Sequence, residues 1–298
     1  MPTLREVRNR ISGIKKTQKI TRAMKMVAAA KLRRAQMNVV AARPYAAKMK
    51  ELLVHLAAQA EDQPGSLLVP REERKHSLLM VVTSDRGFCG AFNSNVIKAA
   101  IDHINAATAS HAVREPIGLV CVGKKGSDYF TKRNYTVREK RVGIFNQLVY
   151  AEAQSLARTL VAGYLGGDYD QVEIIYNEFK NVAQQRIVVE QFLPVPAEVV
   201  KEEDKEHRRS TDYIYEPSAP EILAALVPKY LDFQIWRILL ESFAAEQGAR
   251  MAAMENATEN ANELITTLQL QYNKARQAAI TKELLEIVSG AEALRQAD

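Results

Sequence analysis

Two short glycine-containing segments in the middle of the sequence are the places where catalytic chemistry would be expected. The first is residues 85–90 (DRGFCG) and the second is residues 123–126 (GKKG), and each follows a run of apolar residues. A turn at the end of a parallel strand can bind phosphate or expose a cysteine nucleophile.

Neither segment has the spacing that this chemistry requires. A phosphate-binding loop needs two glycines flanking four residues and then Lys-Ser/Thr, and a dinucleotide site needs three spaced glycines. No histidine accompanies Cys89, and the histidines are scattered along the chain at His55, His76, His103, His111 and His207. We therefore predict no catalytic residue, cofactor or metal site. A small α/β enzyme with helical extensions is the third of three functional hypotheses, after the two that follow below.

The two cysteines, Cys89 and Cys121, lack metal-ligand spacing. Reduced thiols in a cytosolic setting are the expected state. No apolar run is long enough for a membrane span, and the first residues lack the apolar core of a signal peptide.

Residues 1–34 are strongly basic. They contain eleven Lys and Arg side chains and one acidic residue, Glu6, so this segment carries +10 and the remainder of the chain −4. Such a block suggests nucleic acid or another anionic partner. A solvated helix face would have the same composition.

The same N-terminal region has a heptad pattern. Thirteen of sixteen positions spaced alternately by three and four residues are apolar, which indicates a long left-handed coiled-coil helix. The positions are Leu4, Val7, Ile11, Ile14, Gln18, Thr21, Lys25, Ala28, Leu32, Ala35, Val39, Ala42, Ala46, Met49, Leu53 and Leu56. Because the three polar positions are adjacent, we expect the apolar face to rotate there onto Ile20, Met24 and Val27.

A second heptad series lies near the C-terminus. It runs through Met251, Met254, Thr258, Ala261, Ile265, Leu268, Tyr272, Ala275 and Ala279. We expect this helix to begin after Pro228 and to end near Ser289, with Gly290 as its C-cap. The two separated series predict an internal antiparallel pair.

Between the helices the apolar period changes to that of strands. Residues 77–83, 117–122, 172–176 and 187–192 predict strands, and residues 94–107 and 146–165 predict helices. Their alternation indicates a small α/β domain with a mostly parallel sheet. The predicted organisation is an N-terminal helix (1–60), an α/β domain (75–195), a charged loop and connection (196–228) and a C-terminal helix (229–290).

A nucleic-acid-binding coiled-coil protein is the second functional alternative. The basic residues could neutralise phosphates, but the segment has no aromatic residues to stack on bases. In a basic zipper the charges precede the heptads, whereas here they overlap them. An internal antiparallel pair fits this arrangement better.

Four separated segments resemble the gamma subunit family of F-type ATP synthases, in the family's order. They are residues 17–36 (TQKITRAMKMVAAAKLRRAQ) with 43–45 (RPY), residues 84–95 (SDRGFCGAFNSN), residues 212–217 (DYIYEP), and residues 246–253 (EQGARMAA) with 268–290. The resemblance covers nearly the whole chain.

The resemblance implies a mechanical function. In this family the paired helices form a shaft inside a ring of alpha and beta subunits, and the α/β domain forms a foot on the membrane c-subunit ring. Proton flow turns the shaft, which changes the nucleotide affinities of the beta subunits in turn. The expected partners are alpha, beta, epsilon and the c ring, without nucleic acid, and the expected location is peripheral, on the cytoplasmic face of a bacterial membrane.

The resemblance also assigns roles to individual positions. Met24, Lys25, Arg250, Gln277, Thr281 and Glu283 match contacts to the alpha/beta ring. Ile280, Leu284, Leu285, Ile287 and Val288 would form an apolar bearing at the tip. Tyr213, Tyr215 and Glu216 match contacts to the c ring and epsilon. The chain lacks the cysteine-bearing insertion of thiol-regulated members, so we expect no such redox switch.

Overall fold

The chain is divided into two compact units. The computed structural model describes residues 3–57, 67–71, 75–109, 116–181, 184–196, 216 and 218–295. We call residues 1–27 with 251–298 the helix-pair unit, and residues 28–250 the α/β unit. The terminal helices, α1 (Leu4–Ala57) and α6 (Ala219–Arg295), each contribute to both units.

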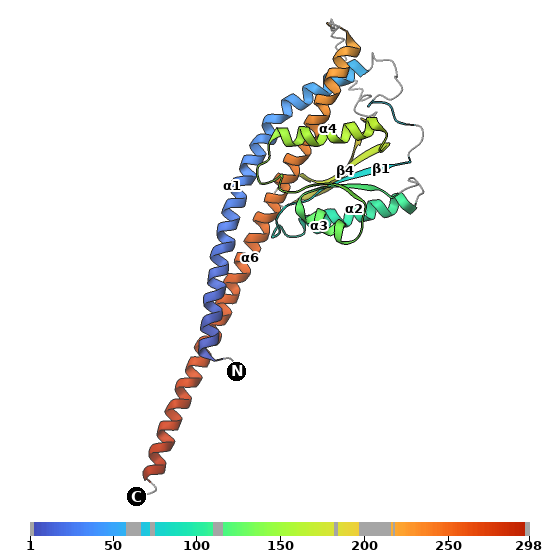
Figure 1. The fold of residues 1–298 in the computed structure, drawn as a ribbon. Helices are drawn as coiled ribbons and strands as arrows, with labels where there is room; N and C mark the ends of the chain where they lie inside the picture. The colour runs from blue at the N-terminus through green and yellow to red at the C-terminus, as the bar shows by residue number, and fades with distance from the viewer. Residues whose placement is uncertain are drawn as a thin grey trace. The chain divides into compact units, whose positions relative to one another are not determined.

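In the helix-pair unit, α1 and α6 lie side by side and antiparallel (Figure 1). Successive contacts between the two helices involve increasing residue numbers in α1 and decreasing residue numbers in α6. The contacts are Gln18 with Asn262, Thr21 with Thr258, and Lys25 with Glu255. The prediction of an internal antiparallel pair is confirmed.

The apolar seam keeps a single heptad register. All sixteen predicted positions of α1 and all nine of α6 are buried or half-buried. The expected rotation near residues 18–25 is wrong, because Ile20 is 60% exposed and Val27 56%, whereas Thr21 is 8% exposed. The polar residues stay in the seam because each has a polar partner on the other helix.

Helix α1 begins with a capping box. The backbone N–H of Thr3 donates to Oε2 of Glu6 at 3.0 Å, and the N–H of Glu6 donates to Oγ1 of Thr3 at 3.3 Å. These bonds satisfy two backbone donors that a helix start leaves without intrahelical partners.

The α/β unit contains a five-stranded sheet in the order β3-β2-β1-β4-β5. Four strands are parallel, and β5 pairs antiparallel with β4. This confirms the predicted mostly parallel sheet. The strands are β1 (Ser77–Val82), β2 (Gly118–Val122), β3 (Val137–Arg141), β4 (Gln171–Phe179) and β5 (Gln185–Leu193).

Helices cover both faces of the sheet (Figure 1). Helices α2 (Phe92–Ala109) and α3 (Lys124–Lys132) cover one face, and α4 (Tyr150–Gly166) covers the other. The α4 face also buries parts of α1 and α6, for example Leu53 and Ile235, both fully buried. The central strands are therefore apolar on both faces, as in other doubly covered parallel sheets.

Helix α6 is longer at both ends than predicted. It begins at Ala219 and passes through Pro228, which lacks a backbone donor for the carbonyl of Ala224. Both residues are exposed, so water can satisfy that carbonyl, while Val227 beside them is buried and anchors the helix. The helix also continues past Gly290 to Arg295, so the predicted C-cap is wrong.

Two short elements were missed. The segment expected to be a turn at residues 123–126 opens α3, and β3 is a charged edge strand with the sequence VREKR. Of the predicted charged loop and connection (196–228), residues 197–215 and 217 lie outside the described residues, and residues 219–228 belong to α6.

Candidate functional site

Asp85, in the loop after β1, accepts hydrogen bonds from the backbone of two other segments of the chain. Asp85 accepts backbone N–H groups from Lys124 at 3.0 Å and Gly143 at 2.8 Å through Oδ1, and from Phe145 at 3.3 Å through Oδ2. Lys124 is the first residue of α3, so this carboxylate lies where a helix N-terminus would bind an anion. The segments at 85–90 and 123–126 are thus joined to each other.

Gly123 has a structural reason to be glycine. Its φ is +89°, and a Cβ at this position would lie 2.0 Å from the carbonyl oxygen of Thr83. Its N–H donates to the carbonyl of Arg141 at 2.8 Å. The glycine therefore permits close approach of two strand ends.

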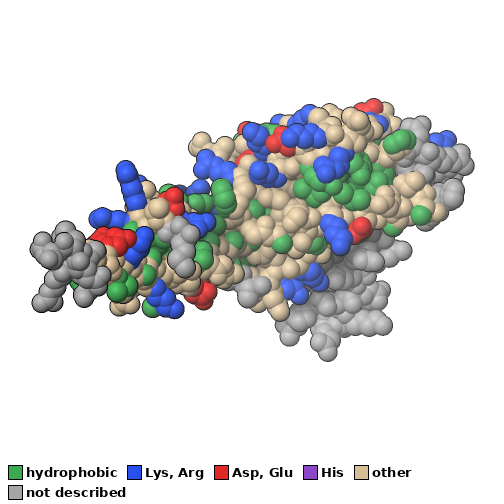
Figure 2. Space-filling view, turned by 90° about the horizontal axis from the view of Figure 1, so that it is seen from below, with side chains coloured by type: hydrophobic (Ala, Val, Ile, Leu, Met, Phe, Trp, Pro, Cys, Tyr) green, Lys and Arg blue, Asp and Glu red, His purple; other side chains and the backbone are tan. Residues whose placement is uncertain are grey.

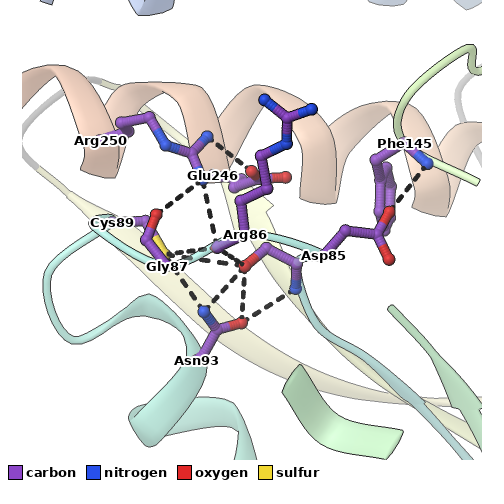
Figure 3. A network of polar contacts seen from close by, with 9 residues as sticks. Asp85, Arg86, Gly87, Cys89, Asn93, Phe145, Glu246 and Arg250 are labelled. Atoms are coloured by element: carbon purple, nitrogen blue, oxygen red, sulfur yellow. Dashed lines mark hydrogen bonds and ion pairs between the residues drawn. The ribbon is translucent and has the colours of Figure 1, made fainter. Parts of the chain in front are cut away.

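Arg250 ties the same loop to α6 (Figure 3). Its guanidinium donates to Glu246 at 2.6 Å and to the carbonyls of Arg86 and Gly87 at 3.3 and 3.2 Å. Arg250 is 9% exposed and Glu246 4%. Burial raises the pKa of Glu246, and the neighbouring Arg250 opposes that shift. The family resemblance assigned Arg250 to the alpha/beta ring, whereas within this chain both of its terminal nitrogens already donate to partners.

Cys89 is a buried structural residue and not an exposed nucleophile. It is 1% exposed, and Nδ2 of Asn93 lies 3.2 Å from its Sγ. Burial raises the pKa of the Cys89 thiol, and it raises that of Cys121 to about 12. A thiol in such a site stays protonated and unreactive at neutral pH. Both cysteines are free, as predicted.

Phe88 is the exposed aromatic residue of this loop, and no role was predicted for it from the sequence. It has a φ of +62° and is 75% exposed. A positive φ is uncommon outside glycine and is retained only where the surroundings enforce it. The bonds from Arg250 to the two preceding carbonyls and the buried Cys89 that follows supply that constraint.

The predicted contact residues of α1 lie at the polar part of the seam. Met24 is half-buried, and Lys25 forms an ion pair with Glu255. Oγ1 of Thr21 lies 2.7 Å from Oγ1 of Thr258. Figure 2 shows Lys and Arg side chains beside apolar ones on one face of the molecule.

Helix α6 is exposed from residue 280 to residue 291. Gln277, Thr281 and Glu283 are all exposed, and Oγ1 of Thr281 donates to the carbonyl of Gln277 at 2.9 Å. The five apolar residues predicted as a bearing are also solvent-exposed: Ile280 (49%), Leu284 (58%), Leu285 (61%), Ile287 (68%) and Val288 (59%).

The register of the pair explains this exposure. Thr21 is level with Thr258, and Gln18 with Asn262, so successive residues toward the start of α1 are level with later residues of α6. Thr3, the first described residue, is therefore level with α6 near residue 277. Beyond that point the described part of α1 has no residue to cover the apolar side chains.

Of the predicted foot contacts, Glu216 is exposed, and Tyr213 and Tyr215 lie outside the described residues. Within the described parts of the chain, no group of three or more His, Cys, Asp or Glu side chains is placed to hold a metal ion. Likewise, none of the described helices is both long and apolar enough to cross a membrane.

The fold and these surfaces define a class of protein: a mostly parallel α/β domain whose chain continues at both ends into long helices that pair antiparallel. Solved structures share this fold. The central stalk of the Tetrahymena thermophila mitochondrial ATP synthase matches with a TM-score of 0.60 and 28% identity, over 80% of this chain and 99% of that one. A chain of the Euglena gracilis mitochondrial ATP synthase shares the fold with a TM-score of 0.66 and 22% identity, over 98% of this chain and 94% of that one.

Sequence comparison identifies the family. The family model described as ATP synthase matches residues 3–294. The ATP synthase gamma chain of Chlorobaculum parvum is 50% identical over 99% of this chain and 100% of the relative, and that of Cytophaga hutchinsonii is 49% identical over 99% of both. The chain belongs to the ATP synthase gamma chain family.

Proposed function

We propose that this chain is the central-stalk rotor subunit of a bacterial F-type ATP synthase. It couples proton flow to ATP synthesis by turning within a ring of alpha and beta subunits and takes part in regulating the ATPase activity of that ring. It supplies no catalytic residue itself and is held at the cytoplasmic face of the membrane through its partners: alpha, beta, epsilon and the c ring. The ion transport and the ATP synthesis belong to the assembly.

The observation that carries this proposal is the exposed apolar end of α6. Five large apolar side chains between residues 280 and 288 are each about half exposed or more. Contiguous exposed apolar surface of this kind marks a protein interaction site. An apolar collar in the alpha/beta ring would bury these side chains, while Gln277, Thr281 and Glu283 would bond to loops of the ring.

The second surface that would contact the alpha/beta ring is the polar part of the seam. Met24 and Lys25 lie on α1 within the basic segment, where acidic loops of beta would be attracted. Glu216, together with Tyr213 and Tyr215, would meet epsilon and the c ring. Arg250 would reach the ring only by exchanging its present partners in the 85–90 loop.

Assembly tests the proposal. Co-expression with alpha and beta subunits from the same organism is expected to yield a stable complex with ATPase activity. Ile287→Lys is expected to weaken assembly about tenfold or more, because it places an unpaired charge in an apolar collar. The matched control is Leu165→Lys on α4, where the original side chain is similarly exposed at 56%.

Two outcomes would contradict the proposal. One is a chain that assembles with no alpha/beta pair, and the other is equal assembly of the Ile287→Lys and Leu165→Lys variants. A separate variant, Met24→Glu, is expected to impair the coupling of proton pumping to ATP hydrolysis more than it impairs folding. Normal coupling in that variant would show that Met24 does not contact the alpha/beta ring.

A further inference from the structure

A half-buried polar cluster joins α6 to the sheet of the α/β unit. Arg237 of α6 binds Glu190 of β5 through two hydrogen bonds, from one Nη to Oε1 at 2.7 Å and to Oε2 at 2.8 Å. Its other Nη donates to the hydroxyl of Tyr176 on β4 at 3.1 Å. The Tyr176 hydroxyl in turn donates to Oε2 of Glu190 at 3.0 Å.

The guanidinium is also held from its own helix. Nε of Arg237 donates to Gln234 at 2.9 Å, and an Nη lies 3.3 Å from a carboxylate oxygen of Glu241. The side chains of Arg237 and Glu190 are 25% and 33% exposed. All the nitrogens of the guanidinium therefore have partners, and these partners lie on three different elements.

Apolar packing surrounds this cluster on the same face of the sheet. Ile174 and Phe192 of β4 and β5 belong to one buried cluster with Ile235 and Ile238 of α6. Apolar contacts supply adhesion in proportion to buried area, but they have no preferred direction. The planar Arg237 guanidinium instead donates from one Nη to Glu190 of β5, from the other to Tyr176 of β4, and from Nε to Gln234 of α6, so its fixed donor directions set both distance and orientation.

An ion pair of this kind contributes little to the free energy of folding. The desolvation of two charges offsets much of their attraction, and well-packed apolar residues in the same place are often equally stable. What the ion pair adds is a unique geometry between the helix and the two strands.

We propose that Arg237 and Glu190 form a torque joint, a directional contact that keeps the sheet from slipping on α6 when force passes between the α/β unit and this helix. The proposal rests on the rotor function proposed above. Arg237 and Glu190 are positioning residues in this account: they hold the foot in register and take no part in contacts with the ring.

The test replaces the pair as a unit in the assembled enzyme. Made in a Glu241→Gln background, so that no carboxylate is left without its ion-pair partner, the double variant Arg237→Met with Glu190→Leu keeps similar volume, and its melting temperature is expected to stay within about 5 °C of the Glu241→Gln parent. Protons pumped per ATP hydrolysed, measured in membrane vesicles against an existing proton gradient, are expected to fall about threefold. ATP hydrolysis by the complex without a gradient is expected to stay unchanged.

A second ion pair in the same sheet serves as the control. Arg186 and Glu178 pair at 2.9 Å between β5 and β4. The variant Arg186→Met with Glu178→Leu is expected to pump normally. Arg237→Lys keeps the charge but loses the planar set of donors that reaches Glu190, Tyr176 and Gln234, so its proton pumping is expected to fall between that of wild type and that of the double variant.

The outcomes separate this inference from the rotor function. If the wild-type chain fails to assemble and pump, the rotor function itself is wrong. If the wild-type chain pumps and the Arg237→Met/Glu190→Leu variant pumps equally well against the gradient, the torque joint is wrong. A double variant that no longer folds would also contradict the inference, because the pair would then be needed for stability.

Discussion

The α/β unit is held together by dense apolar packing, whereas three successive layers of the helix-pair unit are polar. Leu156 of α4 is fully buried between helix and sheet. In the helix pair, Thr21 and Thr258 share a hydrogen bond at the centre of the seam, and Lys25 and Glu255 form a half-exposed ion pair. An interior of the first kind resists local opening, and an interface of the second kind favours one register over tight packing.

The buried ion pair of the α/β unit gives the largest expected effect. Glu246→Ala leaves the guanidinium of Arg250 buried with only the carbonyls of the 85–90 loop as partners. We expect the free energy of unfolding to fall by about 4 kcal/mol. Urea denaturation measures this, and a loss as small as that of an exposed pair such as Lys282 with Glu286 would show that water reaches Arg250.

The apolar core gives the next largest effect. Leu156→Ala removes a fully buried side chain and leaves a cavity, so unfolding should require about 3 kcal/mol less. In the helix pair, Leu268 is half-buried, and Leu268→Ala should lower stability by roughly 1 kcal/mol. Denaturation of both variants under the same conditions compares the two units directly. Equal losses of unfolding free energy would contradict the difference in packing between them.

The polar layer of the helix pair should respond in the opposite direction to the core. Thr21→Val with Thr258→Val replaces a hydrogen-bonded pair by apolar groups of similar shape, and it should raise stability by about 1 kcal/mol. Either single variant leaves the remaining hydroxyl with only a carbonyl of its own helix as partner and should lower stability relative to the double variant. Cysteine cross-linking between residues 14 and 265 in the double variant tests whether the register has loosened, and an unchanged pattern would show that the threonines do not set it.

The smallest expected effect is a pH dependence in the α/β unit. Nε2 of His103 on α2 lies 2.8 Å from the carboxylate of Glu173 on β4. This hydrogen bond raises the pKa of His103, and partial burial opposes the shift. The stabilisation is fully present below the unfolded pKa of about 6.5 and is lost as pH rises through the higher folded pKa.

Unfolding free energies measured from pH 6 to pH 9 check this dependence. The wild type should lose stability across that range relative to Glu173→Gln, in which the ion pair is absent. Parallel curves for the two proteins would contradict the assignment.

Much of the fold was predictable because local pattern and tertiary packing agree. The heptad positions of both terminal helices are buried or half-buried, and the four predicted strands all lie in the sheet. Helix α3 and strand β3 were missed for a physical reason. Nine residues containing Gly126 make a weak isolated helix, and Phe130, which is fully buried, stabilises it only after the sheet has formed.

The candidate site was less predictable from the sequence. The spacing of Glu246 and Arg250 by four residues indicates an ion pair on one helix face. The acceptors in the 85–90 loop lie more than 150 residues away in the sequence, so no local pattern could reveal them. The seam rotation was predicted wrongly because polar heptad residues were taken to leave the interface, when each has a partner on α6.

Rotation of the chain within its ring is the most direct test of the rotor function. Lys98 of α2 is exposed, and both native cysteines are buried, so Lys98→Cys would accept a probe selectively. In a complex with immobilised alpha and beta subunits, we predict stepwise rotation of the probe in one direction when ATP is added. A complex that hydrolyses ATP while the probe stays still would contradict the account.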